Sequence, residues 1–187
     1  MELARTDYNR NEYTVEDVMN LPDGQRAELI DGHWFDMATP NRIHQEIVMA
    51  VSWELRNYIR GKGGKCRVYP APFAVFLKKD NRNYLEPDVV VVCDEDKLSD
   101  RGCEGAPDLV VEVVSPSTKR RDYGLKLFKY RMAGVKEYWV INPETRIINS
   151  YVFDVDEEKG WGDQISFDEE LVSELFPDFS MRLAEVL

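Results

Sequence analysis

The most regular pattern in this chain is a pair of short apolar runs, Val89–Val92 and Leu109–Val111, in which nearly every side chain is β-branched. Pro, Gly, Asp and Ser residues bound both runs. Short β-branched runs with such boundaries are typical of buried strands rather than of helices. We therefore expect strands over residues 87–93 and 108–114, with a loop over residues 94–107 between them.

Two other stretches have the spacing of amphipathic helices. Between residues 43 and 60 the apolar positions are 43, 47, 50, 51, 55 and 58, which form one face of a helix of about five turns. A second helix is expected from Asp122, as its N-terminal cap, to Ala133, with Gly134 closing it. Its buried face is expected to consist of Leu125, Phe128 and Met132.

Shorter signals complete the order of elements. Thr14 to Asp17 has the form of a capping box and predicts a helix ending at Met19. The Asp31-Gly32 dipeptide predicts a hairpin, because a type I′ turn needs a positive φ at both central residues. Further strands are expected at four places: residues 65–78 with Pro70 and Pro72 marking an edge or a break, residues 137–142, residues 147–154, and a short one after residue 164. The tail is expected to pack back as a helix or a turn pair. The core order is helix, three strands, helix, strand, so we expect one domain of the α/β (α+β) class spanning residues 1–187.

Composition changes this picture at two points. The net charge is −11, from 24 basic and 35 acidic residues, which counts against non-specific nucleic-acid binding by the whole surface. A local basic patch is present at Lys119–Arg121, with Lys126, Lys129 and Arg131 nearby. Neither a signal peptide nor a membrane span is recognisable, and the three cysteines show no CxxC spacing. We therefore expect a cytoplasmic protein with reduced thiols and no membrane partner.

The candidate chemistry lies in acidic residues placed in the two apolar strands. Asp88 stands where the first strand begins, and Glu112 lies within the second. Burial of a carboxylate is costly unless it is paired or bound to a cation. Opposing residues on neighbouring strands approach within about 5 Å, so Asp88 and Glu112 can share a divalent metal ion, with Lys126 just beyond. Asp108 also follows a proline, but it lies about 13 Å from Glu112 along the same strand, which is too far to share that ion.

Each of these residues also has a purely structural interpretation. Asp88 can cap a turn, Glu112 can form a buried ion pair with Lys126 or Lys129, and Lys126 can be an exposed helix residue. Taken together and in this order, the three residues favour a metal site. No Walker loop, zinc-finger spacing or GxSxG elbow occurs in the chain, which argues against an ATPase, a zinc protein and a serine hydrolase.

Four segments, PDVVVV, PDLVVEVVSPST, RRDYGLKLFKY and GVKEYWVINP, resemble the Uma-type (DUF820-like) family of restriction-endonuclease-like proteins in the PD-(D/E)XK nuclease superfamily. The resemblance extends to the AELIDG hairpin and the LFPDFS tail. It implies a restriction-endonuclease-like core, with a central mixed β-sheet flanked by helices in the order αβββαβ, an added N-terminal hairpin and added C-terminal strands. It also implies a metal-dependent endonuclease that hydrolyses phosphodiester bonds in DNA with Mg²⁺ or Mn²⁺.

The same resemblance implies roles for individual residues. Asp88 and Glu112 are expected as metal ligands, together with the backbone carbonyl of Val113. Val114 stands where the superfamily pattern has a lysine. In this family a lysine on the following helix takes that role, and Lys126 matches its position as the third catalytic group.

Two further residues join the candidate site through the resemblance. Family members tend to carry a Glu at the position of Glu28 and a His at the position of His44, so both are expected to support catalysis. Taken alone, Glu28 is equally a solvated strand carboxylate, and His44 is a hydrogen-bonding residue at the start of a helix. The alternative functions are a catalytically degenerate nuclease-fold binding protein, which Val114 and the net charge favour, and a metal-dependent hydrolase of another phosphoester. A homodimer fits the cutting of a duplex, since two strands need two sites.

Overall fold

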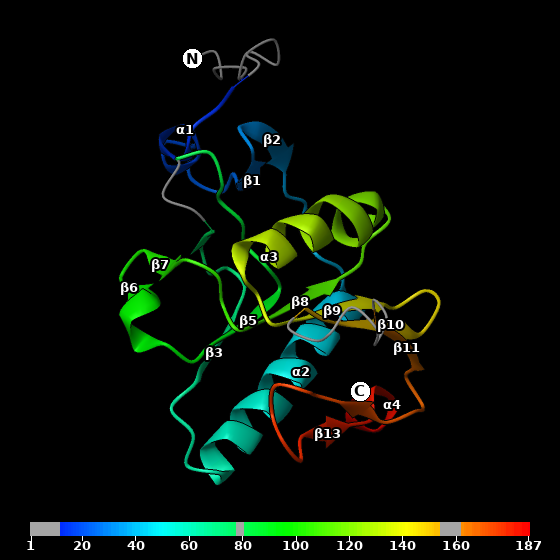
Figure 1. The fold of residues 1–187 in the computed structure, drawn as a ribbon. Coiled ribbons are helices and arrows are strands. Elements are labelled where there is room, and N and C mark those ends of the chain that lie inside the picture. Colours follow the sequence, from blue (N-terminus) through cyan, green and yellow to red (C-terminus); the bar gives the residue numbers. More distant parts are fainter. Residues whose placement is uncertain (1–11, 78–80, 154–161) are drawn as a thin grey trace.

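The computed structural model describes residues 12–77, 81–153 and 162–187. Its central element is a six-stranded sheet with the order β11-β10-β9-β8-β5-β3 (Figure 1). The strands are β3 (Arg67–Pro70), β5 (Val89–Val92), β8 (Leu109–Val113), β9 (Glu137–Asn142), β10 (Ile147–Val152) and β11 (Asp163–Ser166). Strands β8 and β9 pair in parallel, and the other neighbours pair antiparallel. The expected mixed sheet is therefore confirmed, and β3, which ends at Pro70, lies at an edge of the sheet.

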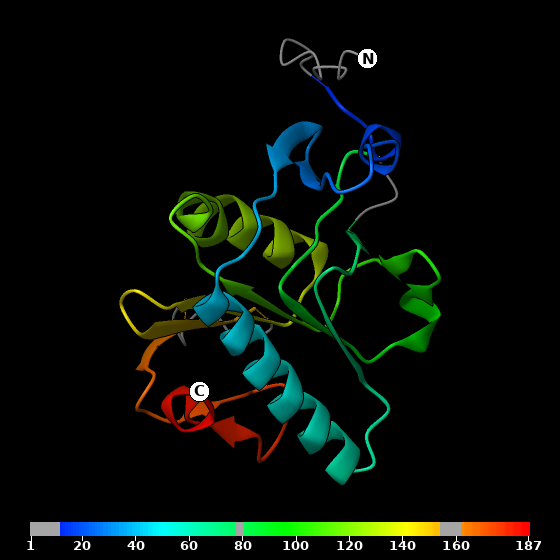
Figure 2. The same ribbon diagram turned by 180° about the vertical axis from the view of Figure 1, so that it is seen from behind.

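Helices cover both faces of this sheet. Helix α2 (Arg42–Gly61) packs on one face, while the π-helical turn η2 (Arg121–Lys126) and helix α3 (Leu127–Ala133) lie on the other (Figures 1 and 2). Two apolar clusters result, with alternate residues of β5 and β8 facing each side. All four side chains of β5 and all five of β8 are buried, as expected for strands covered on both faces.

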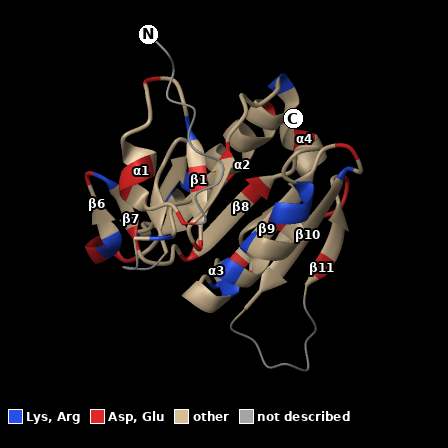
Figure 3. Cartoon of the chain, turned by 90° about the horizontal axis from the view of Figure 1, so that it is seen from above, with Lys and Arg blue, Asp and Glu red and all other residues tan. Residues whose placement is uncertain are grey.

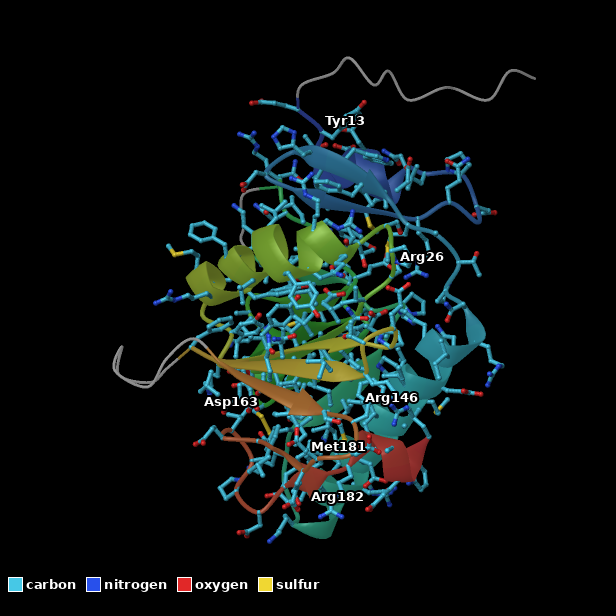
Figure 4. The ribbon with its side chains drawn as sticks, turned by 90° about the vertical axis from the view of Figure 1, so that its right-hand side faces the viewer. Tyr13, Arg26, Arg146, Asp163, Met181 and Arg182 are labelled. Atoms are coloured by element: carbon cyan, nitrogen blue, oxygen red, sulfur yellow. A yellow bond between two sulfur atoms is a disulfide. The ribbon has the colours of Figure 1, made fainter. Side chains whose placement is uncertain are left out.

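The N-terminal hairpin stands beyond α3, on the side away from the sheet (Figure 4). It consists of β1 (Ala27–Ile30) and β2 (His33–Asp36), joined by Asp31 at φ 51° and Gly32 at φ 81°. The predicted hairpin is confirmed, with a positive φ at both turn residues. Helix α1 (Val15–Met19) precedes it and carries the predicted capping box between Thr14 and Asp17.

Residues 94–107 form a small sheet, and the prediction of a loop there is wrong. The segment contains η1 (Glu95–Lys97), β6 (Leu98–Ser99) and β7 (Gly102–Glu104), and β7 also pairs in parallel with β4 (Val75–Phe76). At Gly102 a Cβ atom would lie 2.2 Å from the carbonyl oxygen of Ala74, so only glycine allows this approach. Strands of two or three residues leave no periodic pattern, which is why the pairing is visible only in the folded chain.

The C-terminal segment packs on the α2 side of the sheet (Figures 1 and 2). It comprises β12 (Leu171–Val172), β13 (Ser180–Met181) and α4 (Leu183–Val186). Phe176 and Phe179 contact the ring of Tyr58 on α2. The strand expected over residues 147–154 corresponds to β10, with residue 154 outside the described residues.

The helical stretch over residues 121–133 buries a different face from the one expected. Leu125, Phe128 and Met132 are 36%, 58% and 62% exposed. Asp122 is not an N-terminal cap, but lies inside the π-helical turn. The buried positions are instead Asp122, Lys126 and Tyr130, because this face of the helix meets Glu112 of β8. Gly134 closes the helix in the left-handed conformation, as predicted.

Two cysteines form a disulfide, so the expectation of reduced thiols is wrong for them. Cys66 precedes β3 and Cys93 follows β5, and the antiparallel register that pairs Arg67 with Val92 brings the two sulfur atoms together. Cys103 is a buried free thiol. Among the described residues, no helix has both the length and the apolar character needed to cross a membrane.

Candidate active site

A cavity of about 720 Å³ opens where the ends of β5 and β8 meet the N-terminal hairpin and the start of α2. It is lined by all of the residues expected at the site, which are Glu28, His44, Asp88, Glu112, Val113 and Lys126. They come from β1, the first turn of α2, the residue before β5, strand β8 and the last residue of η2. Five elements distant in the sequence therefore converge on one cavity, as an enzyme site requires.

Asp88 and Glu112 lie opposite each other on neighbouring strands. The register that pairs Val89 with Val111 continues one step outward to these two residues. The Oδ2 atom of Asp88 accepts a hydrogen bond of 2.7 Å from the backbone N–H of Val113, which fixes the carboxylate at the end of β8. The close approach of the two carboxylates expected from strand pairing is thus consistent with the observed register.

Glu112 is buried and held at one oxygen. Its Oε1 atom accepts hydrogen bonds of 2.8 Å from the Nζ atom of Lys126 and of 2.8 Å from the hydroxyl of Tyr130. Its Oε2 atom makes no hydrogen bond within the described part of the chain. Burial raises the pKa of Glu112 well above its ordinary value against the charge of Lys126, and the neighbouring Asp122 raises it further.

Lys126 lies at the centre of an acidic group. Its Nζ atom is 2.7 Å from Oε1 of Glu28, 2.8 Å from Oε1 of Glu112 and 3.8 Å from Oδ1 of Asp122. Burial alone would lower the pKa of Lys126, but Glu112, Glu28 and Asp122 outweigh it and raise that pKa. Lys126 is therefore a permanent cation at neutral pH. Figure 3 shows basic residues on the helix labelled α3 and an acidic segment of the strand labelled β8.

Glu28 and Asp122 complete the acidic group. Glu28 is fully buried; its Oε1 atom also accepts a 3.2 Å hydrogen bond from the backbone N–H of Glu86. The Oε2 atom of Glu28 and the Oδ1 atom of Asp122 are buried without a hydrogen-bond partner within the described residues. Burial raises the pKa of Asp122. Sequence reasoning treated Asp122 only as a helix cap, although its spacing of four residues from Lys126 could have placed both on one face.

Asp122 and Lys126 both belong to the π-helical turn η2. A π-helical turn is wider than an α-helical turn by one residue and is frequently found at functional sites. The turn begins at Arg121 and ends at Lys126, and both side chains line the cavity. Neither its presence nor its position is visible from hydrophobic periodicity.

His44 contacts Asp88 from the other side of the sheet. Its Nε2 atom lies 3.3 Å from Oδ2 of Asp88, and Asn41 caps the helix by accepting the backbone N–H of His44 at 2.9 Å. Burial lowers the pKa of His44, but the hydrogen bond and charge of Asp88 and a backbone bond at Val113 raise it above its ordinary value. His44 is thus placed to carry a proton beside Asp88.

The charges at the base of the cavity do not balance. Among the described residues, the carboxylates of Glu28, Glu112 and Asp122 surround Lys126, and Glu28 also pairs with Arg121. Asp88 lines the same cavity beside His44. With all four carboxylates ionised and His44 neutral, these groups carry two negative charges in excess, and a proton on His44 would leave one. Burial is the main cause of the raised pKa values of Glu112 and Asp122, and neighbouring carboxylates raise them further. A divalent cation would offset the negative excess.

The donor set also fits such an ion. In the described residues no three His, Cys, Asp or Glu side chains form a metal cluster. Mg²⁺ does not need one, since it commonly binds through one or two carboxylates and keeps several waters. The carboxylates of Asp88 and Glu112 and the carbonyl of Val113 are hard oxygen donors of that kind.

Asp108 lies apart from this site, as predicted. Its Oδ1 atom pairs with Lys136 at 2.7 Å and its Oδ2 atom accepts the backbone N–H of Cys93 at 2.7 Å. It is buried at the opposite end of the β5–β8 pair and does not line the cavity.

Comparisons with known proteins agree with this fold. A solved structure described as a putative nuclease belonging to DUF820 from Anabaena variabilis aligns over 93% of this chain and 97% of its own, with a TM-score of 0.73 and 14% identity. That likeness establishes the restriction-endonuclease-like fold. A second structure, of the type IIG restriction endonuclease BpuSI, aligns over 68% of this chain and 12% of its own at a TM-score of 0.36 and 15% identity, which is too low to carry an inference.

Sequence comparisons place the chain in a family. The uncharacterized protein slr1290 of Synechocystis is 31% identical over 106 residues, which is 57% of this chain and 54% of that protein, so the match spans about half the length of this curated relative. The model of the Uma2 family, described as "Putative restriction endonuclease", matches residues 15–184. The chain therefore belongs to the Uma2 family of restriction-endonuclease-like proteins.

Proposed function

We propose that this protein is a metal-dependent endonuclease that hydrolyses phosphodiester bonds in DNA. The observation that carries the proposal is the surplus of carboxylates (Glu28, Asp88, Glu112 and Asp122) over the cations Lys126 and Arg121, beside the Oε2 atom of Glu112, which makes no hydrogen bond within the described residues. A buried excess of this size is costly unless a cation offsets it. Family membership and the fold agree with the proposal.

Asp88, Glu112 and the carbonyl of Val113 would hold Mg²⁺ or Mn²⁺. The ion would supply positive charge against the developing phosphorane and make a bound water more acidic. The donors are all oxygen atoms and two of them are carboxylates, which suits either ion.

The side chains around the ligands have separate tasks. Lys126 and the hydroxyl of Tyr130 hold Oε1 of Glu112, while its Oε2 atom makes no hydrogen bond within the described residues. Glu28 and Asp122 occupy the other contacts of Lys126, so Lys126 orients Glu112 rather than acting as a base. His44, with its raised pKa, is the group that can take up or release a proton near neutral pH.

One observation favours a second candidate, a nuclease-fold protein that binds without cutting. Val114 occupies the position of the superfamily lysine and is buried at 7% exposure, so it supplies no catalytic group. The net charge of −11 also weakens non-specific contact with DNA. Such a protein would have no need to bind a divalent metal at Asp88 and Glu112.

Metal binding and cleavage together separate the two candidates. Mn²⁺ is titrated by calorimetry into the wild type and into the Asp88→Ala/Glu112→Ala variant, and a supercoiled plasmid and a labelled duplex are incubated with each protein in Mg²⁺, Mn²⁺ or EDTA. We expect metal binding and metal-dependent cleavage by the wild type and loss of both in the double variant. An Asp108→Asn variant serves as the matched control, since Asp108 lies outside the cavity. If the wild type is folded but does not bind the added Mn²⁺, the result would support the non-cutting alternative.

A further inference from the structure

Arg121 is a half-buried cation whose guanidinium makes no hydrogen bond within the described residues. Its side chain is 14% exposed and lines the cavity with Asp88, Glu112 and Lys126. Its Nη2 atom is 3.6 Å from Oε2 of Glu28, which is an ion pair beyond hydrogen-bond distance, and its Nε atom is buried without a partner. Buried polar groups are nearly always hydrogen-bonded, so an exception of this kind calls for a ligand.

The N-terminal hairpin holds Arg121 in place. The guanidinium carbon lies 4.8 Å from the ring centroid of Phe35, within the range of a cation–π contact. Phe35 and Glu28 are directly opposite each other in the β1–β2 pair, so one cross-strand pair supplies both contacts. The ring and the carboxylate restrict the guanidinium and leave its N–H donors unused.

The other cations of the cavity are already engaged. Among the described residues, three Lys or Arg side chains line it, namely Arg26, Arg121 and Lys126. Arg26 donates to Glu86 from Nε at 2.8 Å and also from Nη2, and Lys126 contacts Glu28 and Glu112. Of the three, Arg121 is the cation whose charged group makes no hydrogen bond within the described residues.

We propose that Arg121 binds the non-bridging oxygens of a phosphodiester group in this cavity. The inference rests on the proposed nuclease function and assigns the substrate contact that Lys126 cannot make. A planar guanidinium presents paired N–H donors that match the geometry of phosphate oxygens. The contact would also add positive charge to the cavity that Asp88 and Glu112 line. Arg121 is then a phosphate-binding residue of the site.

Binding is tested with two probes and three variants. Dimethyl phosphate, a simple phosphodiester, is titrated while the Nε–H resonance of Arg121 is followed by nuclear magnetic resonance. A labelled DNA duplex is titrated by fluorescence anisotropy, with Ca²⁺ in place of Mg²⁺, into the wild type, Arg121→Gln, Arg121→Lys and Arg120→Gln. The last is the matched control, because Arg120 is exposed and does not line the cavity.

We expect the Arg121 resonance to shift with dimethyl phosphate and Arg121→Gln to weaken duplex binding roughly 10- to 100-fold, the range of a charge-assisted contact. Arg121→Lys should recover part of that loss, since it keeps the charge but not the fork, and Arg120→Gln should change binding less than Arg121→Gln. In cleavage assays the loss should fall mainly on KM. Should Arg121→Gln fail to fold, the wild-type resonance and the Arg121→Lys variant still decide the question.

The outcomes separate this inference from the proposed function. One outcome would overturn the role of Arg121 and keep the nuclease function. In that case the wild type cleaves DNA, the Arg121 resonance does not shift, and Arg121→Lys binds the duplex as well as the wild type does. A shifted resonance in a protein that binds Mn²⁺ but never cuts DNA would support phosphodiester binding by Arg121 and overturn the endonuclease activity. If Arg120→Gln weakens duplex binding as much as Arg121→Gln does, the effect comes from general surface charge, and the inference is overturned.

Discussion

The two ends of the β5–β8 strand pair each carry a Pro-Asp dipeptide, but the two aspartates have different surroundings. Pro87-Asp88 precedes β5, and Pro107-Asp108 precedes β8. Each aspartate accepts a hydrogen bond of 2.7 Å from a backbone N–H at the C-terminal end of the partner strand. Asp88 accepts it from Val113, and Asp108 accepts it from Cys93, the residue after β5. Up to this point the two ends are equivalent.

They differ in what lies beyond the carboxylate. The Oδ1 atom of Asp108 forms an ion pair with the Nζ atom of Lys136 at 2.7 Å, and we call this the closed end of the strand pair. Asp88 contacts His44 and lines a cavity that Glu112 also lines, and we call this the open end. The comparison shows that a Pro-Asp dipeptide by itself only caps the end of a strand. The candidate site lies at the end where further carboxylates surround the aspartate. Four predictions test that difference.

The largest effect is expected on activity at the open end. Glu112→Gln should lower DNA cleavage by on the order of 10³-fold, because it removes a ligand charge with almost no change in shape. Asp108→Asn makes the same chemical change at the closed end and should leave cleavage within the range of the wild type. Steady-state cleavage of a labelled duplex measures both, and equal losses would contradict the distinction between the two ends.

The next effect concerns stability and compares the two lysines. Lys126→Met should lower the free energy of unfolding by roughly 3–5 kcal/mol, since it leaves buried carboxylates without their cation. Lys136→Met should cost only about 1 kcal/mol, because Lys136 is 50% exposed and Asp108 keeps its bond from Cys93. Urea denaturation at neutral pH gives both values. Similar costs for the two variants would show that Lys126 is not central to the acidic group.

A smaller stability difference is expected between the two aspartates. Asp108→Ala should cost roughly 1–3 kcal/mol through the lost backbone bond and the stranded Lys136. Asp88→Ala loses an equivalent backbone bond but also removes one charge of the excess, so in metal-free protein its cost should be lower. The same urea experiments, run in EDTA, rank the two variants. A greater cost for Asp88→Ala would argue against a negative excess at the site.

The smallest effect is a dependence of stability on pH. The pKa values of Glu112 and Asp122 are raised in the folded chain, so the native state holds protons that the unfolded state has released. Stability from these groups is complete below their ordinary pKa values near 4.5 and 3.8, and it is lost as pH rises through the raised native values. Glu112→Gln should flatten that decline in metal-free protein. An unchanged slope in this variant would assign the dependence elsewhere, for example to Glu137, whose pKa is also raised by burial.

The candidate site was only partly predictable from the sequence. Asp88 and Glu112 stand out because a carboxylate in or beside a β-branched run needs a partner. Lys126 stands just beyond them in the sequence, while its catalytic role, Glu28 and His44 entered through resemblance to a family, and the cavity brings all of them together. Asp122 was missed because the sequence pattern predicted a helix cap at that position, although its spacing of four residues from Lys126 was visible. Arg121 was missed as a site residue because its contacts are with a hairpin far away in the sequence.

Local patterns by themselves determined the strands of the sheet, helix α2, the capping box of α1 and the turn at Asp31-Gly32, because each depends on neighbours within a few residues. Tertiary structure alone decided which face of the helix after Thr118 is buried, which strand β7 pairs with, and that Cys66 meets Cys93. The helix shows why. Its apolar residues Phe128 and Met132 face outward, since burying them would have left the carboxylate of Glu112 under the helix without the donors Lys126 and Tyr130. A buried charge costs more than an exposed apolar side chain gains by burial, and no local pattern records which charge lies on the strand beneath.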